Sequence, residues 1–291
     1  MNTPVFDTTL TEFIRCLSGR NLSGHTISAY ETDLRQFLTW LCDNDLSVTQ
    51  PAHVTRGHIN EYLSHLADLG RSGVTRARKL AAIREFFKYL LDQGAITSSP
   101  AATISMPKKE RRSRVYLRPD EYSKLLSAAG ANPRDFCILQ LFLQTGVRVS
   151  ELVNLTLDDI DLAGATLSIR EGKGKKDRHI PLEKKGIQAL KSYLSVRPQT
   201  SDPHLFLNYE GQGISRRGVE KLIAKYVKQA GLTKKVSCHS LRHTFGSYKA
   251  ERGVTAFQLQ EWMGHTSITT TQLYVHIGRE NARKAMEQSS L

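Results

Sequence analysis

Residues 135–152 read DFCILQLFLQTGVRVSEL and contain the most continuously apolar helix pattern of the chain. Apolar side chains stand on nearly every face of residues 135–145, which predicts a helix at the centre of a core. Arg148 follows where this helix ends, and its guanidinium needs an anionic partner because it does not lose its proton. Glu151 lies three residues further on. An ordinary ion pair within a helix is therefore one interpretation of Arg148.

Downstream of this segment, two short β-like runs flank a glycine-rich turn that reads EGKGKK. The runs, residues 166–170 and 177–182, predict an antiparallel hairpin. Lys173 stands between two glycines of the turn, and Lys175 and Arg178 crowd it with positive charge, which favours release of its proton. Taken alone, such a turn is also typical of a charged surface loop.

Upstream, residues 1–105 predict an all-helical domain. Apolar side chains recur there at spacings of three and four, the period of a helix with one buried face. The last of these helices opens with Arg76 and Lys79, which indicate either a solvated face or an edge that faces DNA. The four patterns predict a compact bundle of helices over residues 6–17, 26–41, 59–69 and 74–91.

Residues 106–114 read MPKKERRSR and interrupt the apolar pattern. We expect a linker over residues 106–115, between a helical domain at 1–105 and an α+β domain at 116–291. A basic linker can lie along a phosphate backbone. The side chains expected to do so are Lys108, Lys109, Arg111 and Arg112.

The 291-residue chain has a formal net charge of +13 at pH 7, and this charge is unevenly distributed. Residues 1–105 hold ten Lys and Arg and ten Asp and Glu, so the whole excess lies in the remainder. Such an excess favours a polyanionic partner through release of counterions. A membrane is the rival partner, but no basic amphipathic anchor is present, and no apolar run approaches the roughly 20 residues needed to cross a bilayer.

The N-terminus and the cysteines indicate an intracellular protein. Residues 1–10 contain no Lys or Arg, which argues against a secretory signal. The cysteines are scattered, which argues against a zinc knuckle, and we expect their thiols to stay reduced. They are Cys16, Cys42, Cys137 and Cys238.

Residues 239–246 read HSLRHTFG and place two imidazoles beside a guanidinium. On a helix, His239 and Arg242 share a face, and His243 lies next to them. Metal binding by the two histidines is an alternative. It lacks a third ligand and the intervening glutamate of a metalloprotease helix.

Residues 264–276 read GHTSITTTQLYVH and follow a further helix pattern, which ends at Gly264. His265 is thereby expected at a turn, and Tyr274 on a new helical segment. A tyrosine in such a place more often packs at a partly buried surface than performs chemistry.

Together, these segments suit transfer of a phosphodiester to a tyrosine. Two arginines and two histidines can bind the nonbridging oxygens and stabilise the charge of a pentavalent transition state. A lysine can protonate the departing oxygen, and a tyrosine can attack phosphorus and store the bond as a phosphotyrosine. The chemistry then needs no metal and no other cofactor. The sequence also lacks a phosphate-binding GxxxxGK loop.

The order Arg, Lys, His-x-x-Arg, His, Tyr resembles the tyrosine recombinase (lambda integrase) family, and the whole chain most resembles its Xer subgroup. The motifs span residues 145–276, whereas residues 1–105 match only in helical character and size. Glu151 matches an acidic position that supports the first arginine. The resemblance assigns the family's catalytic positions, in chain order, to Arg148, Lys173, His239, Arg242, His265 and the nucleophile Tyr274.

The resemblance implies a mainly α fold with a small antiparallel β-sheet, arranged as a two-domain DNA clamp. A helical core-binding, SAM-like domain would precede an α+β catalytic domain. The implied activity is site-specific cleavage and rejoining of DNA through a 3′-phosphotyrosyl intermediate and a Holliday junction. Residues 279–291 are the candidate segment for docking on a neighbouring subunit.

The implied partners are a double-stranded recombination site and a tetramer, formed by this chain alone or with a second recombinase. A DNA translocase or accessory activator is a further expected partner, and the nucleoid in the cytoplasm the expected location. Dimer resolution of chromosomes or plasmids and service to a mobile element both fit. A non-catalytic architectural protein and a type IB topoisomerase stay as alternatives. The sequence does not specify the DNA site, because base readout depends on a few side chains in the groove.

Overall fold

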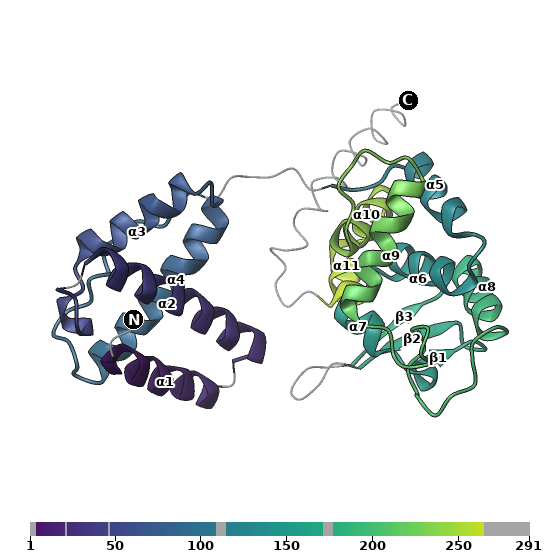
Figure 1. Ribbon diagram of the computed structural model, residues 1–291. Helices are drawn as coiled ribbons and strands as arrows, with labels where there is room; N and C mark the ends of the chain where they lie inside the picture. Colours follow the sequence, from purple (N-terminus) through teal and green to yellow (C-terminus); the bar gives the residue numbers. More distant parts are fainter. Residues whose placement is uncertain (1–3, 21, 46, 109–114, 171–176, 265–291) are drawn as a thin grey trace. The chain divides into compact units, whose positions relative to one another are not determined.

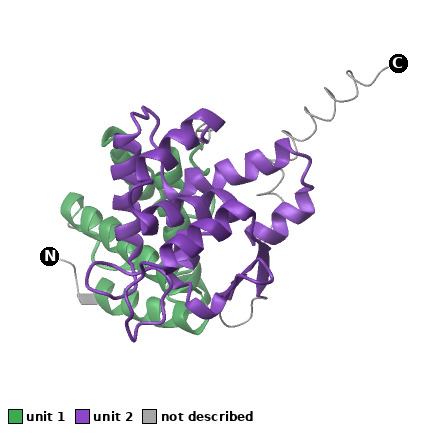
Figure 2. Ribbon diagram, turned by 90° about the vertical axis from the view of Figure 1, so that its right-hand side faces the viewer, with its two compact units in different colours: residues 1–112 green, residues 113–291 purple. Residues whose placement is uncertain are grey.

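The computed structural model describes residues 4–20, 22–45, 47–108, 115–170 and 177–264. The chain divides into two compact units, Met1–Arg112 and Ser113–Leu291 (Figure 2). The division falls within the stretch for which the sequence predicts a linker. Each unit has its own hydrophobic core.

The N-terminal unit is a bundle of helices, as the apolar spacing predicts (Figure 1). Serine or threonine side chains cap the start of three of these helices, where backbone N–H groups otherwise lack acceptors. The core combines aliphatic side chains with aromatic rings, among them Phe13, Phe37 and Phe86. The described elements are α1 (Pro4–Gly19), α2 (Gly24–Asn44), the 3₁₀ turn η1 (Pro51–His53), α3 (Arg56–Asp68) and α4 (Gly73–Asp92).

The C-terminal unit is built around α6 (Pro133–Thr145), the helix with apolar residues on every face. Ile138, Leu139 and Phe142 are fully buried, and α6 packs against α8 and α10. The central position predicted for this helix is therefore confirmed. The other described helical elements are α5 (Pro119–Ala129), α7 (Val149–Asn154), η2 (Leu157–Asp159), α8 (Lys184–Leu194), α9 (Arg216–Gln229), α10 (Cys238–Glu251) and α11 (Ala256–Met263).

A small antiparallel sheet of β1 (Ile160–Asp161), β2 (Thr166–Ile169) and β3 (Arg178–Pro181), in that order, completes this unit. It lies at the end of the unit remote from α5 (Figure 1). Ile169 pairs with Arg178, so β2 and β3 are the two predicted runs, and the predicted turn between them lies outside the described residues. The two-residue strand β1 is too short to give a period and was not predicted.

The mainly helical fold with a small antiparallel sheet is confirmed. Within the described ranges, no helix combines the length and the apolar character needed to span a bilayer.

Candidate active site

The turn after α6 sets the position of Arg148. Gly146 ends the helix with a left-handed φ of 61°, and its N–H donates to the carbonyl of Phe142 at 3.1 Å. A Cβ at this glycine would come within 2.3 Å of the Phe245 ring on α10. Glycine fits both this φ angle and the close approach of Phe245, because it has no side chain. Gly146 thus allows α10 to pack directly on the turn. The chain then places Arg148 as the residue preceding α7.

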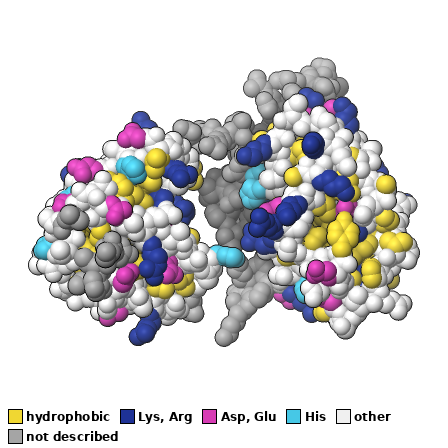
Figure 3. All heavy atoms as spheres, in the orientation of Figure 1, with side chains coloured by type: hydrophobic (Ala, Val, Ile, Leu, Met, Phe, Trp, Pro, Cys, Tyr) yellow, Lys and Arg dark blue, Asp and Glu magenta, His cyan; other side chains and the backbone are white. Residues whose placement is uncertain are grey.

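Three of the predicted catalytic residues, Arg148, His239 and Arg242, line one cavity of about 540 Å³. His239 is exposed in the first turn of α10, and Arg242 lies one turn later with 4% exposure. Lys and Arg side chains gather beside a histidine on the face of this unit shown in Figure 3. The other lining residues are Val147, Val149, Ser150, Arg216, Glu220, Val236, Ser237 and Cys238.

Glu151 binds two arginines. Its Oε1 accepts from Arg148 Nη1 at 2.6 Å, and its Oε2 accepts from the Arg148 backbone N–H at 2.7 Å and from Arg178 Nη2 at 2.8 Å. Burial raises the pKa of this carboxyl, but bonds to Arg178 and then to Arg148 outweigh burial and hold its pKa below the ordinary value. The Arg148–Glu151 ion pair that the sequence predicts is therefore present, with Arg178 as an unpredicted second partner.

The C-terminal end of α11 meets the same arginines. Arg178 Nε donates to the carbonyl of Trp262 at 2.9 Å, and Arg242 Nη2 to that of Met263 at 2.5 Å. Arg148 Nη2 donates to the carbonyl of Gly264. Carbonyls at a helix C-terminus carry partial negative charge, so they are suitable partners for guanidinium groups. Arg242 also donates to the carbonyl of Gly146 at 2.6 Å, which ties α10 to the turn after α6.

A second imidazole, that of His243, and a buried thiol, that of Cys238, lie beside these residues. The rings of His239 and His243 meet edge to face, with centroids 4.8 Å apart. In the part of the chain that the structure describes, no three His, Cys, Asp or Glu side chains gather to hold a metal ion. Burial raises the pKa of the Cys238 thiol to about 11, so this thiol stays protonated at neutral pH and is a poor nucleophile.

The remaining residues assigned from sequence have different positions. Lys108 is exposed. Arg76 is half-buried, and its Nε has no hydrogen-bond partner among the described residues. The residues that lie outside the described ranges are Lys109, Arg111, Arg112, Lys173, Lys175, His265 and Tyr274.

Two cations assigned to DNA contact are instead buried. Lys79 is 5% exposed, and its ammonium donates to Asp33 at 2.9 Å. Arg178 is 7% exposed and binds Glu151 and the end of α11. The sequence pattern missed both pairs because the acidic partner of each lies on a different element, far along the chain.

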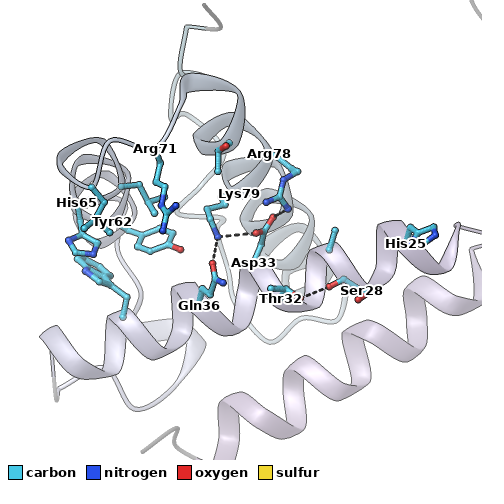
Figure 4. A pocket seen from close by; sticks show the side chains of 15 residues that line it. His25, Ser28, Thr32, Asp33, Gln36, Tyr62, His65, Arg71, Arg78 and Lys79 are labelled. Atoms are coloured by element: carbon cyan, nitrogen blue, oxygen red, sulfur yellow. Dashed lines mark hydrogen bonds and ion pairs between the residues drawn. The ribbon is translucent and has the colours of Figure 1, made fainter. Parts of the chain in front are cut away.

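A groove of about 750 Å³ lies on the N-terminal unit, between α2, α3 and α4 (Figure 4). Lys79 points into it and reaches both Asp33 and Gln36, and Arg78 also binds Asp33. Burial, and next the nearby Asp33, raise the pKa of Tyr62 to about 12, so its hydroxyl stays neutral. Exposed cations, hydroxyls and imidazoles thus surround one neutralised carboxylate. Arg71, His25 and His65 also line this groove, and the sequence pattern does not indicate this because their facing positions depend on how the helices pack.

Comparison with known proteins identifies the family. The model of the phage integrase family matches residues 115–281, and that of the phage integrase N-terminal SAM-like domain matches residues 10–94. Tyrosine recombinase XerC of Thermodesulfovibrio yellowstonii is 35% identical over 99% of this chain and 97% of its own length. Tyrosine recombinase XerD of Listeria monocytogenes is 35% identical over 92% of this chain and 93% of its own.

Solved structures share the fold. A crystal structure of XerA recombinase is 30% identical, with a TM-score of 0.57 over 98% of this chain and 99% of its own. A lambda integrase dimer bound to a COC′ core site is 20% identical, with a TM-score of 0.77 over 91% of this chain and 96% of its own. The identity to Xer proteins over nearly the whole chain, together with the family match, shows that the chain belongs to the phage integrase family and is a site-specific tyrosine recombinase.

Proposed function

We propose that this recombinase cuts and rejoins DNA strands with Tyr274 as its nucleophile. The observation that carries the proposal is that Arg148 lines a single cavity with His239 and Arg242, a pair from a distant part of the sequence. A phosphodiester placed there would meet two guanidinium groups and one imidazole. Such preorganised donors stabilise the charge that develops at phosphorus.

In the proposed reaction, the Tyr274 oxygen attacks phosphorus and gives its proton to water, while the bond to the 5′ oxygen breaks. Lys173 gives a proton to the departing oxygen, and His265 joins the groups that bind the nonbridging oxygens. The product is a 3′-phosphotyrosine and a free 5′ hydroxyl. Attack by a 5′ hydroxyl reverses the step, so the strand is rejoined without an external energy source.

We propose double-stranded DNA as the substrate, with contacts from both units. In the N-terminal unit, the exposed Arg71 and Arg78 at the rim of the groove are suited to phosphate contacts, together with Arg76. The basic side chains of the linker would contact the phosphate backbone of the DNA; they are Lys108, Lys109, Arg111 and Arg112. Lys175, between β2 and β3 in the sequence, would add a further phosphate contact.

The proposed assembly is a tetramer on two recombination sites, built from this chain alone or with a second recombinase. Lambda integrase has been solved as a tetramer bound to a Holliday junction, and XerH on a difH substrate. Dimer resolution of chromosomes or plasmids on the nucleoid and service to a mobile element are both consistent with the proposed reaction. A DNA translocase or another accessory activator is a further proposed partner.

A nicked suicide substrate tests the nucleophile. Tyr274→Phe should bind the recombination site and form no covalent protein–DNA complex on a denaturing gel, because the ring then lacks the attacking oxygen. Tyr209→Phe is the matched control, since this ring is 89% exposed and should leave the covalent complex unchanged. A covalent complex with Tyr274→Phe would show that the nucleophile is misassigned.

The same proteins separate recombination from simple relaxation. On a plasmid with two directly repeated sites, the proposal expects excision of the intervening DNA. The assay is run with this protein alone and with a second recombinase added. Relaxation of supercoils without excision in both cases would instead indicate a type IB topoisomerase.

A further inference from the structure

We propose that Arg178 is a positioning residue for the reaction, and this inference rests on the proposed function. Arg178 acts through Glu151 on Arg148, and it also holds the end of α11. It is not expected to touch the phosphate.

The location of Arg178 separates it from the DNA contacts that its sequence suggests. It is the first residue of β3, paired with Ile169 of β2, and only 7% of it is exposed. It is absent from the described residues that line the cavity. Because a buried guanidinium keeps its charge, partners inside the protein must compensate it.

Arg178 spans two elements with its planar fork. Its Nη2 donates to Glu151 Oε2 at 2.8 Å, and its Nε donates to the carbonyl of Trp262 at 2.9 Å. A lysine carries one ammonium at the end of a flexible chain, so it does not reproduce this pair of directed bonds. Arg178 therefore fixes the start of α7 and the end of α11 relative to β3.

The bond to Glu151 determines how Arg148 is held. Arg148 uses both carboxylate oxygens of Glu151, and Arg178 shares one of them. Without Arg178, Oε2 of this carboxylate keeps only the Arg148 backbone N–H, so Glu151 is held less firmly and the Arg148 side chain is less strictly oriented. Arg148 lines the cavity with a side chain that is 36% exposed, so a loss of orientation there weakens binding of the phosphate charge.

The position of the end of α11 also depends on Arg178. The carbonyls of Trp262, Met263 and Gly264 are bound by Arg178, Arg242 and Arg148, respectively. Of these three arginines, Arg178 is the one that does not line the cavity. It can therefore anchor α11 while the other two arginines bind a phosphate.

We expect Arg178→Lys to lower the rate of covalent complex formation about 10- to 100-fold, as for other residues that orient a reacting group. DNA affinity should stay nearly unchanged, because Arg178 makes no proposed DNA contact. The matched control is Arg134→Lys. Arg134 is also largely buried, and it binds Asp135 at 2.8 Å and the carbonyl of Leu207 at 2.8 Å; neither Arg134 nor these partners line the cavity. This control should keep the parent rate.

A substrate with a neutral methylphosphonate at the scissile position distinguishes positioning from general damage. This group lacks the negative charge that Arg148 neutralises, so the difference between Arg178→Lys and the parent should shrink at least several-fold. A fall in rate of equal size on both substrates, or no fall on the ordinary phosphodiester, would overturn the proposal. Arg178→Gln is the second variant, and loss of folding in both variants would also overturn it.

The parent protein separates this inference from the proposed function. If the parent forms no Tyr274-dependent covalent complex on either substrate, the proposed function fails. If the parent forms it and the Arg178 variants keep the parent rate, only the role of Arg178 fails.

Discussion

At the scale of single residues, one carboxylate binds two arginines, of which Arg148 lines the cavity and Arg178 does not. Glu151 is mostly buried and accepts hydrogen bonds from Arg148 and Arg178, so one carboxylate and two guanidinium groups form a cluster of ion pairs. Removal of one member of a buried ion pair is costly, because it leaves a charge without its partner. Glu151 therefore stabilises the fold and also holds Arg148 in the candidate active site.

The lowered pKa of Glu151 predicts a specific pH dependence. A carboxyl whose pKa is lower in the folded state contributes stability above its unfolded pKa and loses it as the pH falls through the folded pKa. Glu151→Gln should therefore lower the free energy of unfolding by about 3 kcal/mol at neutral pH. This difference from the parent should shrink as the pH falls below the ordinary value of 4.5.

Urea unfolding between neutral and acidic pH measures this difference. The control is Glu210→Gln, at an exposed glutamate, which should change the free energy of unfolding by no more than about 0.5 kcal/mol. A difference for Glu151→Gln that stays constant below pH 4.5 would contradict the assigned ion pairs.

At the scale of elements, the join between α6 and α7 depends on its contact with α10. Gly146 combines a left-handed backbone with a close approach to Phe245, and Arg242 on the same helix binds the carbonyl of this glycine. The turn and α10 are thus fixed to each other by packing and by a hydrogen bond. This contact aligns Arg148 with His239 and Arg242.

Gly146→Ala should destabilise the protein and slow cleavage, because the new Cβ meets both backbone strain and the Phe245 ring. Gly231→Ala is the matched control: this glycine has a φ of +64° and no atom within 4 Å of the added Cβ. The control should lose about 1–3 kcal/mol of stability, from backbone strain alone, and Gly146→Ala should lose more. Thermal unfolding and the rate of covalent complex formation measure the two effects, and equal losses would argue against the close packing of α10.

At the scale of the whole molecule, the two compact units differ in charge. Residues 1–112 hold 14 Lys and Arg and 11 Asp and Glu, a net charge of +3, whereas residues 113–291 hold 27 and 17, a net charge of +10. Within the N-terminal unit, the buried Asp33 neutralises part of the charge of Lys79 and Arg78. Electrostatic attraction to DNA should therefore come mainly from the C-terminal unit.

Separate fragments of residues 1–108 and 113–291 test this difference. Each contains its own hydrophobic core, so each should fold by itself. On a duplex without a recombination site, the affinity of the C-terminal fragment should fall more steeply between about 50 and 200 mM salt, because it displaces more counterions. Fluorescence anisotropy gives both slopes, and a steeper slope for residues 1–108 would be the opposite of the expected result.

Sequence patterns by themselves determined the elements and much of the composition of the site. The helix period located the four N-terminal helices and the buried α6, because burial of one face or of all faces is recorded in the local spacing of apolar residues. The order of Arg148, His239 and Arg242 within short motifs indicated the family. The structure then placed these three residues around one cavity.

Only the tertiary structure decided which cations are exposed and which are buried. Lys79 and Arg178 were both expected to face DNA, yet Asp33 on α2 and Glu151 on α7 hold them inside the protein. Main-chain carbonyls at the end of α11 also bind arginines, and a backbone group carries no signal in the sequence. The physical reason is that a local pattern records the face on which a side chain lies, whereas its ion pairs depend on elements brought together from distant parts of the chain.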